Sequence, residues 1–407
     1  MKLKLHWQIL IAFFAAVLYG LLLTEYVKYV SWLGDLFLRA LKMVIIPLVF
    51  SSIVSGVTNI GGGKNLGRLG IKTIIYYIGT STLAILTGLF FVNILKPGVG
   101  ADLGFTKEVE GLAAASESFG TTLLNIIPVN IFQSFTEMNM LQIIFFAILF
   151  GFFISQTETK YQTALIDFFN SVFEVIMKLT MFIIKFTPLG IFGIVSGIVA
   201  EQAGNPSALM DIVGRLSIYM AAVISALIIH SAVTLPLIVK IIGRVNPIKH
   251  LKAMTTPLLT AFSTASSNAT LPLTMEAVEK NSGVSNKITS FTLPLGATIN
   301  MDGTALYECV AAIFIAQAYG IELTIVQQII VVITALLASI GAAGIPMAGL
   351  VMMSIVLTAV GLPLEGVGLI LAVDRLLDMF RTTVNVWSDS CGAVVIAKTE
   401  GETLSVE

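Results

Sequence analysis

Long apolar stretches separated by short polar connections fill the first 245 residues of the chain. A helix that crosses a bilayer needs about 20 mostly apolar residues. Six stretches meet that requirement, near residues 7–24, 32–57, 70–95, 121–155, 163–200 and 209–243. The first has the basic start of a signal peptide, but its apolar run is long and no clear cleavage site follows it. We therefore predict six membrane helices here, the first of them retained.

The pattern changes after residue 245, where two apolar segments have centres made of small and hydroxyl residues. They are PLLTAFSTASSNATLPLTM, residues 257–275, and ALLASIGAAGIPMAGLVMM, residues 335–353. Backbone can leave helical pairing at membrane depth only where protein or a water-filled cavity satisfies its polar groups. Each segment therefore predicts a re-entrant hairpin. Close helix packing through small residues is the alternative for either segment taken alone.

Each interrupted segment is followed by a helix with a polar stripe, at residues 292–310 and 376–390. On a helical wheel the polar residues of the second helix fall within about 100° of arc, and they are Asp374, Asp378, Arg381, Thr382, Asn385 and Asp389. A hairpin followed by a polar helix, occurring twice, is typical of an inverted-repeat transporter with its site between the repeats. The predicted fold is thus an all-α polytopic membrane protein with eight transmembrane helices and two re-entrant hairpins.

Composition and charge agree with this class. The chain is 56% hydrophobic and 12% charged, against about 25% charged in globular proteins. A net charge of −1 implies no attraction to nucleic acid. Basic residues cluster on alternate connections, whereas the loop at 96–117 is acidic, so the positive-inside rule predicts a cytoplasmic amino terminus. Cys309 and Cys391 lie in apolar segments and are predicted to be buried free thiols.

Ionisable residues inside membrane spans are rare, and each is a functional hypothesis with a partner to be named. The planar guanidinium of Arg381 fits a carboxylate, and Asp378 on the same stripe could bind an ammonium group. Together they suit an acidic amino acid. The spacing is equally consistent with a structural ion pair between the two residues, because ion pairs three residues apart are common on helices.

Oxygen-rich surroundings mark two other carboxylates, Asp302 and Asp389, which lie near amide and hydroxyl side chains. Such clusters suit a hard cation, and sodium is the natural choice in a membrane carrier. Glu308 stands in apolar surroundings and is either a proton carrier or a carboxyl satisfied by one hydrogen bond. His230 has no acidic residue nearby in the sequence, which predicts a packing role and leaves no nucleophile–base pair for an enzyme.

Four motifs in order resemble the dicarboxylate/amino acid:cation symporter family, which includes archaeal aspartate transporters and mammalian excitatory amino acid transporters. They are SSNATLP (266–272), NMDGTA (300–305), SIGAAGIPMAG (339–349) and D-x-x-R-T-x-x-N-x-x-x-D (378–389), with TIIYYIGTS (73–81) in addition. The resemblance implies a homotrimer in which a transport domain moves like an elevator against a scaffold. Residues 1–245 would supply mainly scaffold and trimer contacts, with the helix near 70–95 joining the transport core at 246–407.

The resemblance also implies a site. Asp378 would hold the substrate amino group and Arg381 its side-chain carboxylate, while the rest of the pocket would come from Thr382, Asn385, Thr304, Ser267 and Gly349. Up to three sodium ions would bind at three sets of residues: Asp389, Asn300, Asn385 and the carbonyl of Gly296; Thr298, Met301, Ser339, Ile340 and Ala342; and Tyr77, Thr80, Ser81, Asn300 and Asp302. Glu308 resembles a glutamate linked to proton and potassium coupling.

The sequence departs from the family pattern at four positions. Ala265 and Met379 stand where many members have a second arginine, which Arg375 could replace. Trp387 and Ser388 stand where a smaller residue and a glycine are usual. These departures put the shape of the pocket and its sodium affinity in question.

The resulting prediction is a sodium-coupled symporter of L-aspartate or L-glutamate in the plasma or inner membrane, with both termini cytoplasmic. Proton or potassium coupling stays open, and no organic cofactor, nucleic-acid partner or enzymatic activity is expected. The alternatives are a proton-coupled C4-dicarboxylate carrier or a neutral amino acid carrier of the same fold and, from another class, an ion channel. The carboxylate of Asp378 argues against a substrate that lacks an amino group.

Overall fold

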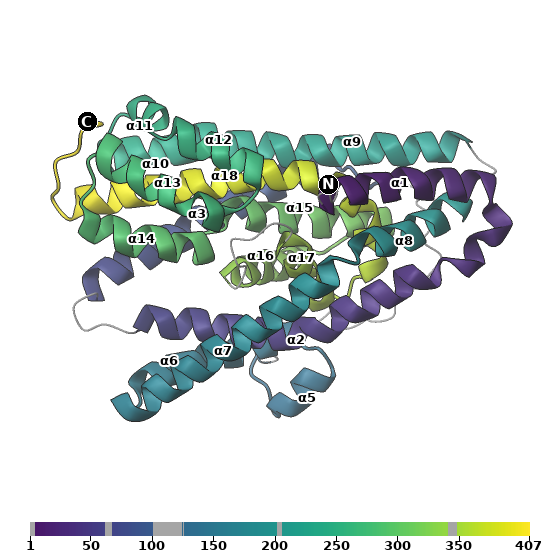
Figure 1. Cartoon of the computed structure of the whole chain (residues 1–407), viewed down its shortest axis with the longest axis horizontal. Coiled ribbons are helices and arrows are strands. Elements are labelled where there is room, and N and C mark those ends of the chain that lie inside the picture. Colours follow the sequence, from purple (N-terminus) through teal and green to yellow (C-terminus); the bar gives the residue numbers. More distant parts are fainter. Residues whose placement is uncertain (1–4, 62–66, 101–123, 125, 202–205, 341–347) are drawn as a thin grey trace.

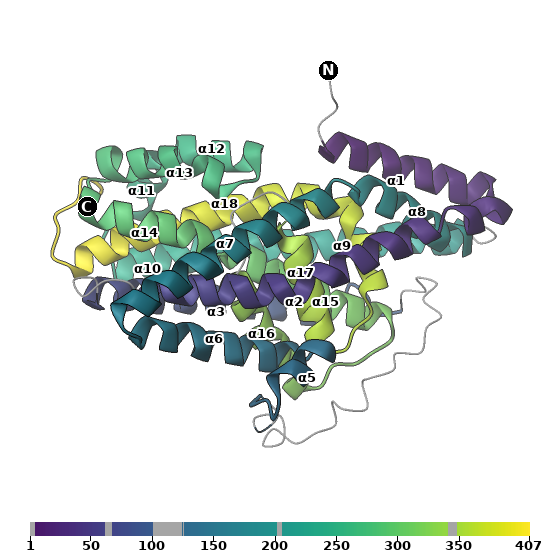
Figure 2. The ribbon, with the colours of Figure 1, turned by 60° about the horizontal axis from the view of Figure 1, so that its bottom comes forward.

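The computed structural model describes residues 5–61, 67–100, 124, 126–201, 206–340 and 348–407, and all regular structure within these ranges is helical. The first three predicted stretches are confirmed as helices α1 (Leu5–Leu22), α2 (Trp32–Gly61) and α3 (Gly67–Leu95), with the short 3-10 helix η1 (Thr24–Tyr29) between the first two. Helices α6 (Met140–Gln156) and α7 (Thr159–Ile184) pack against α2 and cross one side of the molecule (Figure 1, Figure 2).

Three of the predicted stretches are not single helices. The stretch 121–155 contains α5 (Ile131–Thr136) and α6, and its residues 121–123 and 125 lie outside the described part. The stretch 163–200 bends by 50° between α7 and α8 (Thr187–Glu201). Pro188 explains this bend, because a proline fits the first turn of a helix but disfavours helical geometry in the residue before it. The stretch 209–243 contains α9 (Pro206–Ile229), a π-helical turn η3 (His230–Thr234) and α10 (Leu235–Ile241).

The first predicted hairpin is present as two short helices, α12 (Thr255–Thr264) and α13 (Ser267–Glu276), which follow α11 (Pro247–Ala253). Ala265 makes the turn in the left-handed conformation, with φ 51°. Ser266 then caps α13, because its side chain accepts a hydrogen bond from the amide of Ala269 at 3.2 Å. The second hairpin has the arms α16 (Ile325–Ile340) and α17 (Ala348–Ala359), and its tip at 341–347 lies outside the described residues.

The two polar helices differ in continuity. The π-helical turn η4 (Ala277–Asn281) leads into α14 (Asn286–Ile299), and the chain then breaks at Asn300 and Met301 before α15 (Asp302–Ala318), so residues 292–310 are not one helix. By contrast, η5 (Leu364–Gly366) leads into α18 (Val367–Thr399), an unbroken helix of 33 residues. Helix α18, yellow in Figure 1, runs along the molecule and contacts α9, α12, α14 and α15.

Length and hydropathy identify four stretches of the described chain that could each cross a membrane: Trp32–Thr58, Arg68–Leu95, Met210–Ile241 and Asn286–Ala318. The bent pair α7 and α8 makes a fifth if it forms one span. The prediction of eight transmembrane helices therefore stays a prediction, as does the depth of each hairpin in the bilayer. Multiple apolar helices nevertheless make this a multi-pass membrane protein by composition.

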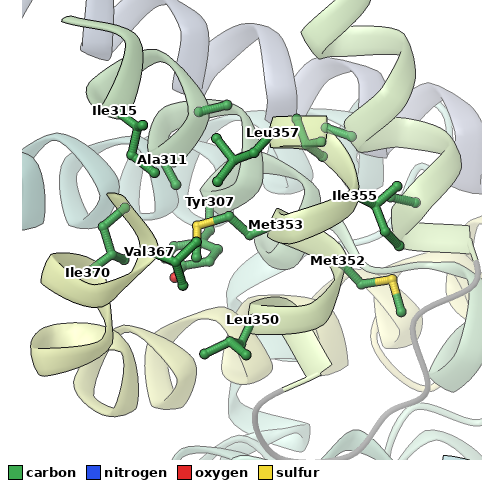
Figure 3. Packing of buried hydrophobic residues seen from close by; sticks show 14 of the residues in the cluster. Tyr307, Ala311, Ile315, Leu350, Met352, Met353, Ile355, Leu357, Val367 and Ile370 are labelled. Carbon is green, nitrogen blue, oxygen red and sulfur yellow. The ribbon is translucent and has the colours of Figure 1, made fainter. Parts of the chain in front are cut away.

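Apolar packing holds the centre of the molecule around α15. Figure 3 shows Tyr307, Ala311 and Ile315 of α15 beside residues of α17 and α18, among them Leu350, Met353, Leu357, Val367 and Ile370. Each of these side chains is buried. Cys309, on the same helix, and Cys391 are buried free thiols, as the sequence predicts.

An ion-pair cluster joins the end of α18 to the start of α3. The Glu400 carboxylate accepts hydrogen bonds from Arg68 and Lys72, each at 2.6 Å. These bonds, first from Arg68 and then from Lys72, lower the pKa of Glu400 to about 2. Glu400 is therefore charged at neutral pH and holds the two helix ends together.

Close backbone contact between α8 and the start of α2 yields a stability prediction. A Cβ added to Gly193 would lie 2.5 Å from the backbone nitrogen of Gly34, whereas a Cβ added to Gly197, one turn along α8, would meet nothing within 4 Å. Gly193→Ala should therefore lower the free energy of unfolding by ~1–3 kcal/mol through overpacking. Gly197→Ala should leave it unchanged or raise it, because alanine favours helix. Thermal unfolding of both variants in detergent would measure this difference, and equal unfolding temperatures would contradict the packing described.

Candidate functional site

Arg381, in the middle of α18, is fully buried, and its charge is balanced by two aspartates of the same helix. Its Nη2 donates to Asp378 Oδ1 at 2.9 Å and lies 3.1 Å from Asp374 Oδ1, within ion-pair distance but without hydrogen-bond geometry. The ion pair that the spacing predicted between Arg381 and Asp378 is therefore present. Among the described residues, Nε and Nη1 of Arg381 have no hydrogen-bond partner. The guanidinium is thus neutralised but keeps donors to offer.

The shape of the space around Arg381 depends on an aromatic ring and two glycines. The guanidinium carbon lies 3.8 Å from the centre of the Tyr307 ring, a cation–π contact. A Cβ at Gly349 would come within 2.5 Å of Nη1, and one at Gly303 within 2.6 Å of the Arg381 carbonyl oxygen. Only glycine lets α15 and α17 approach Arg381 this closely. Gly349 therefore lies directly against the guanidinium of Arg381.

Asn385, one turn beyond Arg381, ties α18 to the start of α15. Its Oδ1 accepts from the amide of Gly303 at 2.7 Å, and its Nδ2 donates to Thr304 Oγ1 at 3.1 Å and to Met301 Sδ at 3.2 Å. The Gly303 amide is one of the free N–H groups at the beginning of a helix, which explains why an amide side chain is needed there. Asn385 and Thr304 are therefore brought together as predicted.

The other residues predicted to bind substrate, Thr382 and Ser267, are also buried. Thr382 follows Arg381 on α18, and Ser267 begins α13, which packs against α18. Arg375 Nη1 lies 3.6 Å from Asp378 Oδ2, so Asp378 stands between two arginines. Met379 supplies no charge, and Ala265 forms the hairpin turn. Arg375 therefore brings a second arginine to Asp378 from a different position than in many family members.

Asp302, fully buried at the start of α15, collects donors from three other helical segments. Its Oδ1 accepts from Ser81 Oγ at 2.6 Å and lies 3.3 Å from Thr80 Oγ1, both on α3. Its Oδ2 accepts from Ser388 Oγ of α18 at 2.6 Å and lies 3.0 Å from His230 Nε2. The oxygens of an ionised Asp302 only accept, so His230 Nε2 is the donor when Asp302 is charged.

The contact between His230 and Asp302 corrects the sequence-based prediction for this histidine, which gave it no acidic partner. The two residues are 72 positions apart, and the π-helical turn His230–Thr234 that carries the histidine has no clear sequence signature. Such turns inside α-helices are frequent at functional sites. Ser231, the next residue, accepts from Trp387 Nε1 through its carbonyl at 3.0 Å. Trp387 also stacks on His250, with ring centres 5.1 Å apart.

Asp389 forms a second buried carboxylate group on α18. Its Oδ1 accepts from Asn300 Nδ2 at 2.9 Å, at the break between α14 and α15. A Cβ added to Gly296 would lie 2.5 Å from the same oxygen and 2.7 Å from the hydroxyl of Tyr77. Asn300, Gly296 and Tyr77 therefore surround Asp389, whereas Asn385, which was grouped with it, bonds to the start of α15 instead. The Gly296 carbonyl accepts the amide of Asn300 at 2.8 Å.

The other predicted cation set is not joined by hydrogen bonds among its described members. Thr298 is exposed and donates to the Leu295 carbonyl at 2.9 Å, and Ser339 donates to Leu336 within α16 at 2.8 Å. Met301 accepts from Asn385, and Ile340 ends α16. Ala342 lies outside the described residues. Helices α14 and α16 do contact each other, so the set shares one region of the fold.

The chemistry of Asp302 and Asp389 fits a hard monovalent cation. Both carboxylates are buried, their described partners are hydroxyl, amide and imidazole groups, and neither has an ion pair with a described lysine or arginine. Oxygen-rich acidic sites of this kind suit hard cations such as sodium. In the described part of the chain, no group of three or more His, Cys, Asp or Glu residues could hold a metal ion.

Glu308 on α15 is fully buried, and neither of its carboxylate oxygens has a hydrogen-bond partner among the described residues. The alternative in which one hydrogen bond satisfies this side chain is therefore wrong for the described part. A buried carboxylate without a hydrogen-bond donor is costly, so a proton on Glu308 would remove that cost.

Comparisons with known proteins place the chain in a family. The profile of the Sodium:dicarboxylate symporter family matches residues 5–399. The chain is 37% identical over 461 residues to excitatory amino acid transporter 3 of Mus musculus, covering 97% of this chain and 86% of the relative. It is 37% identical over 411 residues to the proton/sodium-glutamate symport protein of Geobacillus stearothermophilus, covering 98% and 96%.

A third relative is the proton/glutamate-aspartate symporter of Escherichia coli strain K12, which is 36% identical over 420 residues, covering 98% of this chain and 93% of the relative. These matches extend over nearly the whole chain and include both the broken helix and α18. The chain belongs to the sodium:dicarboxylate symporter family.

Proposed function

We propose that this protein is a sodium-coupled secondary active symporter of acidic amino acids, L-aspartate or L-glutamate. The observation that carries the proposal is the buried guanidinium of Arg381, which is neutralised by aspartates yet keeps Nε and Nη1 without a described partner. Nε carries one N–H group and Nη1 carries two, and these donors can bind a substrate carboxylate with charge-assisted hydrogen bonds. The relatives named as glutamate and aspartate carriers support the same substrate class.

Neighbouring groups suit the other charges of an acidic amino acid. Asp378, within hydrogen-bond distance of Arg381, would bind the substrate ammonium group. Asn385 and Thr382 would bind the main-chain carboxylate, with Thr304, Ser267 and Gly349 completing the pocket. The ion pair between Asp378 and Arg381 does not oppose this role, because it holds both side chains in place before the substrate arrives. A C4-dicarboxylate would leave Asp378 without a cationic partner from the substrate, which favours an amino acid.

Coupling to sodium would pass through the break between α14 and α15. Asn300 contacts Asp389, and the next residue, Met301, contacts Asn385 of the substrate group. Groups that hold sodium at Asp389 and Asp302 therefore share a short backbone segment with groups that hold the substrate. If sodium raises the affinity for substrate, the substrate must raise the affinity for sodium equally. We propose up to three sodium ions, with Glu308 available for an additional proton or potassium step.

The larger assembly is also part of the proposal. The protein would form a homotrimer in the plasma or inner membrane, with cytoplasmic termini. Residues 1–245 would serve mainly as scaffold, and α3 with residues 246–407 would move as a transport domain. The packing of α3 against α15 and α18 supports this division, because α3 shares the Asp302 site with both helices.

Removing the guanidinium tests the substrate assignment. Arg381→Ala should lower uptake of radiolabelled L-aspartate and L-glutamate into proteoliposomes by at least about 30-fold, because truncating one partner of a buried charge pair costs ~2–5 kcal/mol. Sodium binding should persist. Arg215→Ala is the matched control, since Arg215 is a partly exposed arginine paired with Asp211 on α9. Undiminished aspartate uptake by the Arg381 variant would contradict the assigned role.

Neutralising a carboxylate tests the cation assignment. Asp389→Asn keeps the shape of the side chain but removes its charge, so the sodium concentration for half-maximal uptake should rise roughly tenfold or more, a change of ~1.4 kcal/mol or more. Uptake would be measured over a range of sodium concentrations with choline as the replacement ion. Asp211→Asn, on α9, controls for the loss of an exposed carboxylate. If the sodium requirement of the Asp389 variant is unchanged, this residue does not belong to the cation site.

A further inference from the structure

Ser388 occupies a position between the two buried carboxylates of the cation region. It is fully buried on α18, directly before Asp389. Its Oγ donates to Asp302 Oδ2 at 2.6 Å and accepts from Asn300 Nδ2 at 3.0 Å, while Asn300 Nδ2 also donates to Asp389 Oδ1 at 2.9 Å. The hydroxyl therefore links the Asp302 group to the Asp389 group through a continuous set of hydrogen bonds.

The two oxygens of Asp302 have different kinds of donors. Oδ1 faces Ser81 and Thr80, whose hydroxyls can rotate so that their lone pairs face a cation. Oδ2 faces Ser388 and His230. Two hydrogen bonds hold the Ser388 hydroxyl, because its hydrogen is donated to Asp302 and its oxygen accepts from Asn300. Rotating the hydrogen away from Asp302 would lose a short charge-assisted hydrogen bond. Ser388 thus stabilises the negative charge of Asp302 from the side opposite to the rotatable hydroxyls.

We propose that Ser388 is a positioning residue that lowers the sodium affinity of the Asp302 site. This inference rests on the sodium coupling proposed above. A hydrogen bond to a charged group stabilises it most when no cation neutralises that charge. The Ser388 bond therefore stabilises the sodium-free state more than the sodium-bound state. A residue without a hydroxyl at this position leaves Oδ2 with the His230 contact alone, and sodium then meets a less satisfied carboxylate.

Ser390 supplies a matched control on the same helix. It is fully buried two residues further along, and its Oγ donates to the Trp387 carbonyl at 2.8 Å and lies 3.2 Å from His250 Nε2. No described hydrogen bond joins its side chain to Asp302 or Asp389. Ser390→Ala also removes one buried hydroxyl from α18, so it reproduces the loss of stability expected from that change. It leaves the hydrogen-bond donors of Asp302 unchanged.

Sodium titrations of the purified full-length protein, without substrate, test the proposal. Intrinsic tryptophan fluorescence and thermal unfolding in detergent would be followed as sodium replaces choline at constant ionic strength. Ser388→Ala should unfold at a lower temperature than the unaltered protein when sodium is absent. Sodium should raise the unfolding temperature of this variant by more than that of the unaltered protein. The half-saturating sodium concentration of the variant should fall at least about threefold, equivalent to ~0.6 kcal/mol or more. Ser390→Ala should lose stability without a change in that concentration.

Three results would overturn the proposal. A half-saturating sodium concentration equal to that of the unaltered protein would make Ser388 a structural residue only, and a higher one would make it a sodium ligand. If the alanine variant does not fold, Ser388→Gly, which also lacks the hydroxyl, is judged by the same criterion. If the unaltered protein itself does not respond to sodium, the proposed sodium coupling fails together with this inference. If the unaltered protein and the Ser388 variant respond to sodium equally, the inference about Ser388 fails but the proposed sodium coupling stands.

Discussion

A guanidinium that is withdrawn completely from solvent must be compensated where it lies, and much of the described site can be understood from this requirement. Breaking a buried ion pair costs several kcal/mol because it leaves an uncompensated charge. Arg381 therefore has Asp374 and Asp378 on its own helix and the face of Tyr307 beside it. The glycines at 303 and 349 allow neighbouring helices to approach, so polar contacts of the site form in a confined space.

The break at Asn300 and Met301 brings two groups of side chains into contact with the same backbone segment, one around Asp389 and one around Asn385. A continuous helix would use the backbone groups of this segment internally. The break instead lets Asn300 reach Asp389 and leaves the Gly303 amide for Asn385. One short segment therefore contacts both Asp389, which we propose binds sodium, and Asn385, which we propose binds substrate. A displacement of the segment would move both groups together, which would link the two proposed affinities.

The sequence predicts local features of this protein well, because hydrophobic periodicity and turn residues act over short distances. The first three helices, the first hairpin and the polar stripe of α18 follow from such patterns. The bend before Pro188 could have been anticipated from the proline itself. The contact between His230 and Asp302 could not, since it joins residues that are far apart in the chain through a π-helical turn without a known pattern. Ser388 was noticeable as a departure from the family, but its two side-chain partners, Asp302 and Asn300, lie at the break between α14 and α15, far from it in the sequence.

The uninterrupted course of α18 fixes the spacing of the whole site. Asp378 and Asp389 are separated by 11 residues along this helix, which corresponds to about three turns and roughly 16 Å of axial rise. The carboxylates of Asp378 and Asp389 therefore emerge on nearly the same side of one helix. Deleting or inserting a single residue between them would rotate one against the other by about 100°. Substitutions within the interval leave this spacing unchanged, whereas an insertion or deletion preserves the relative orientation of the two carboxylates only if it adds or removes nearly whole turns.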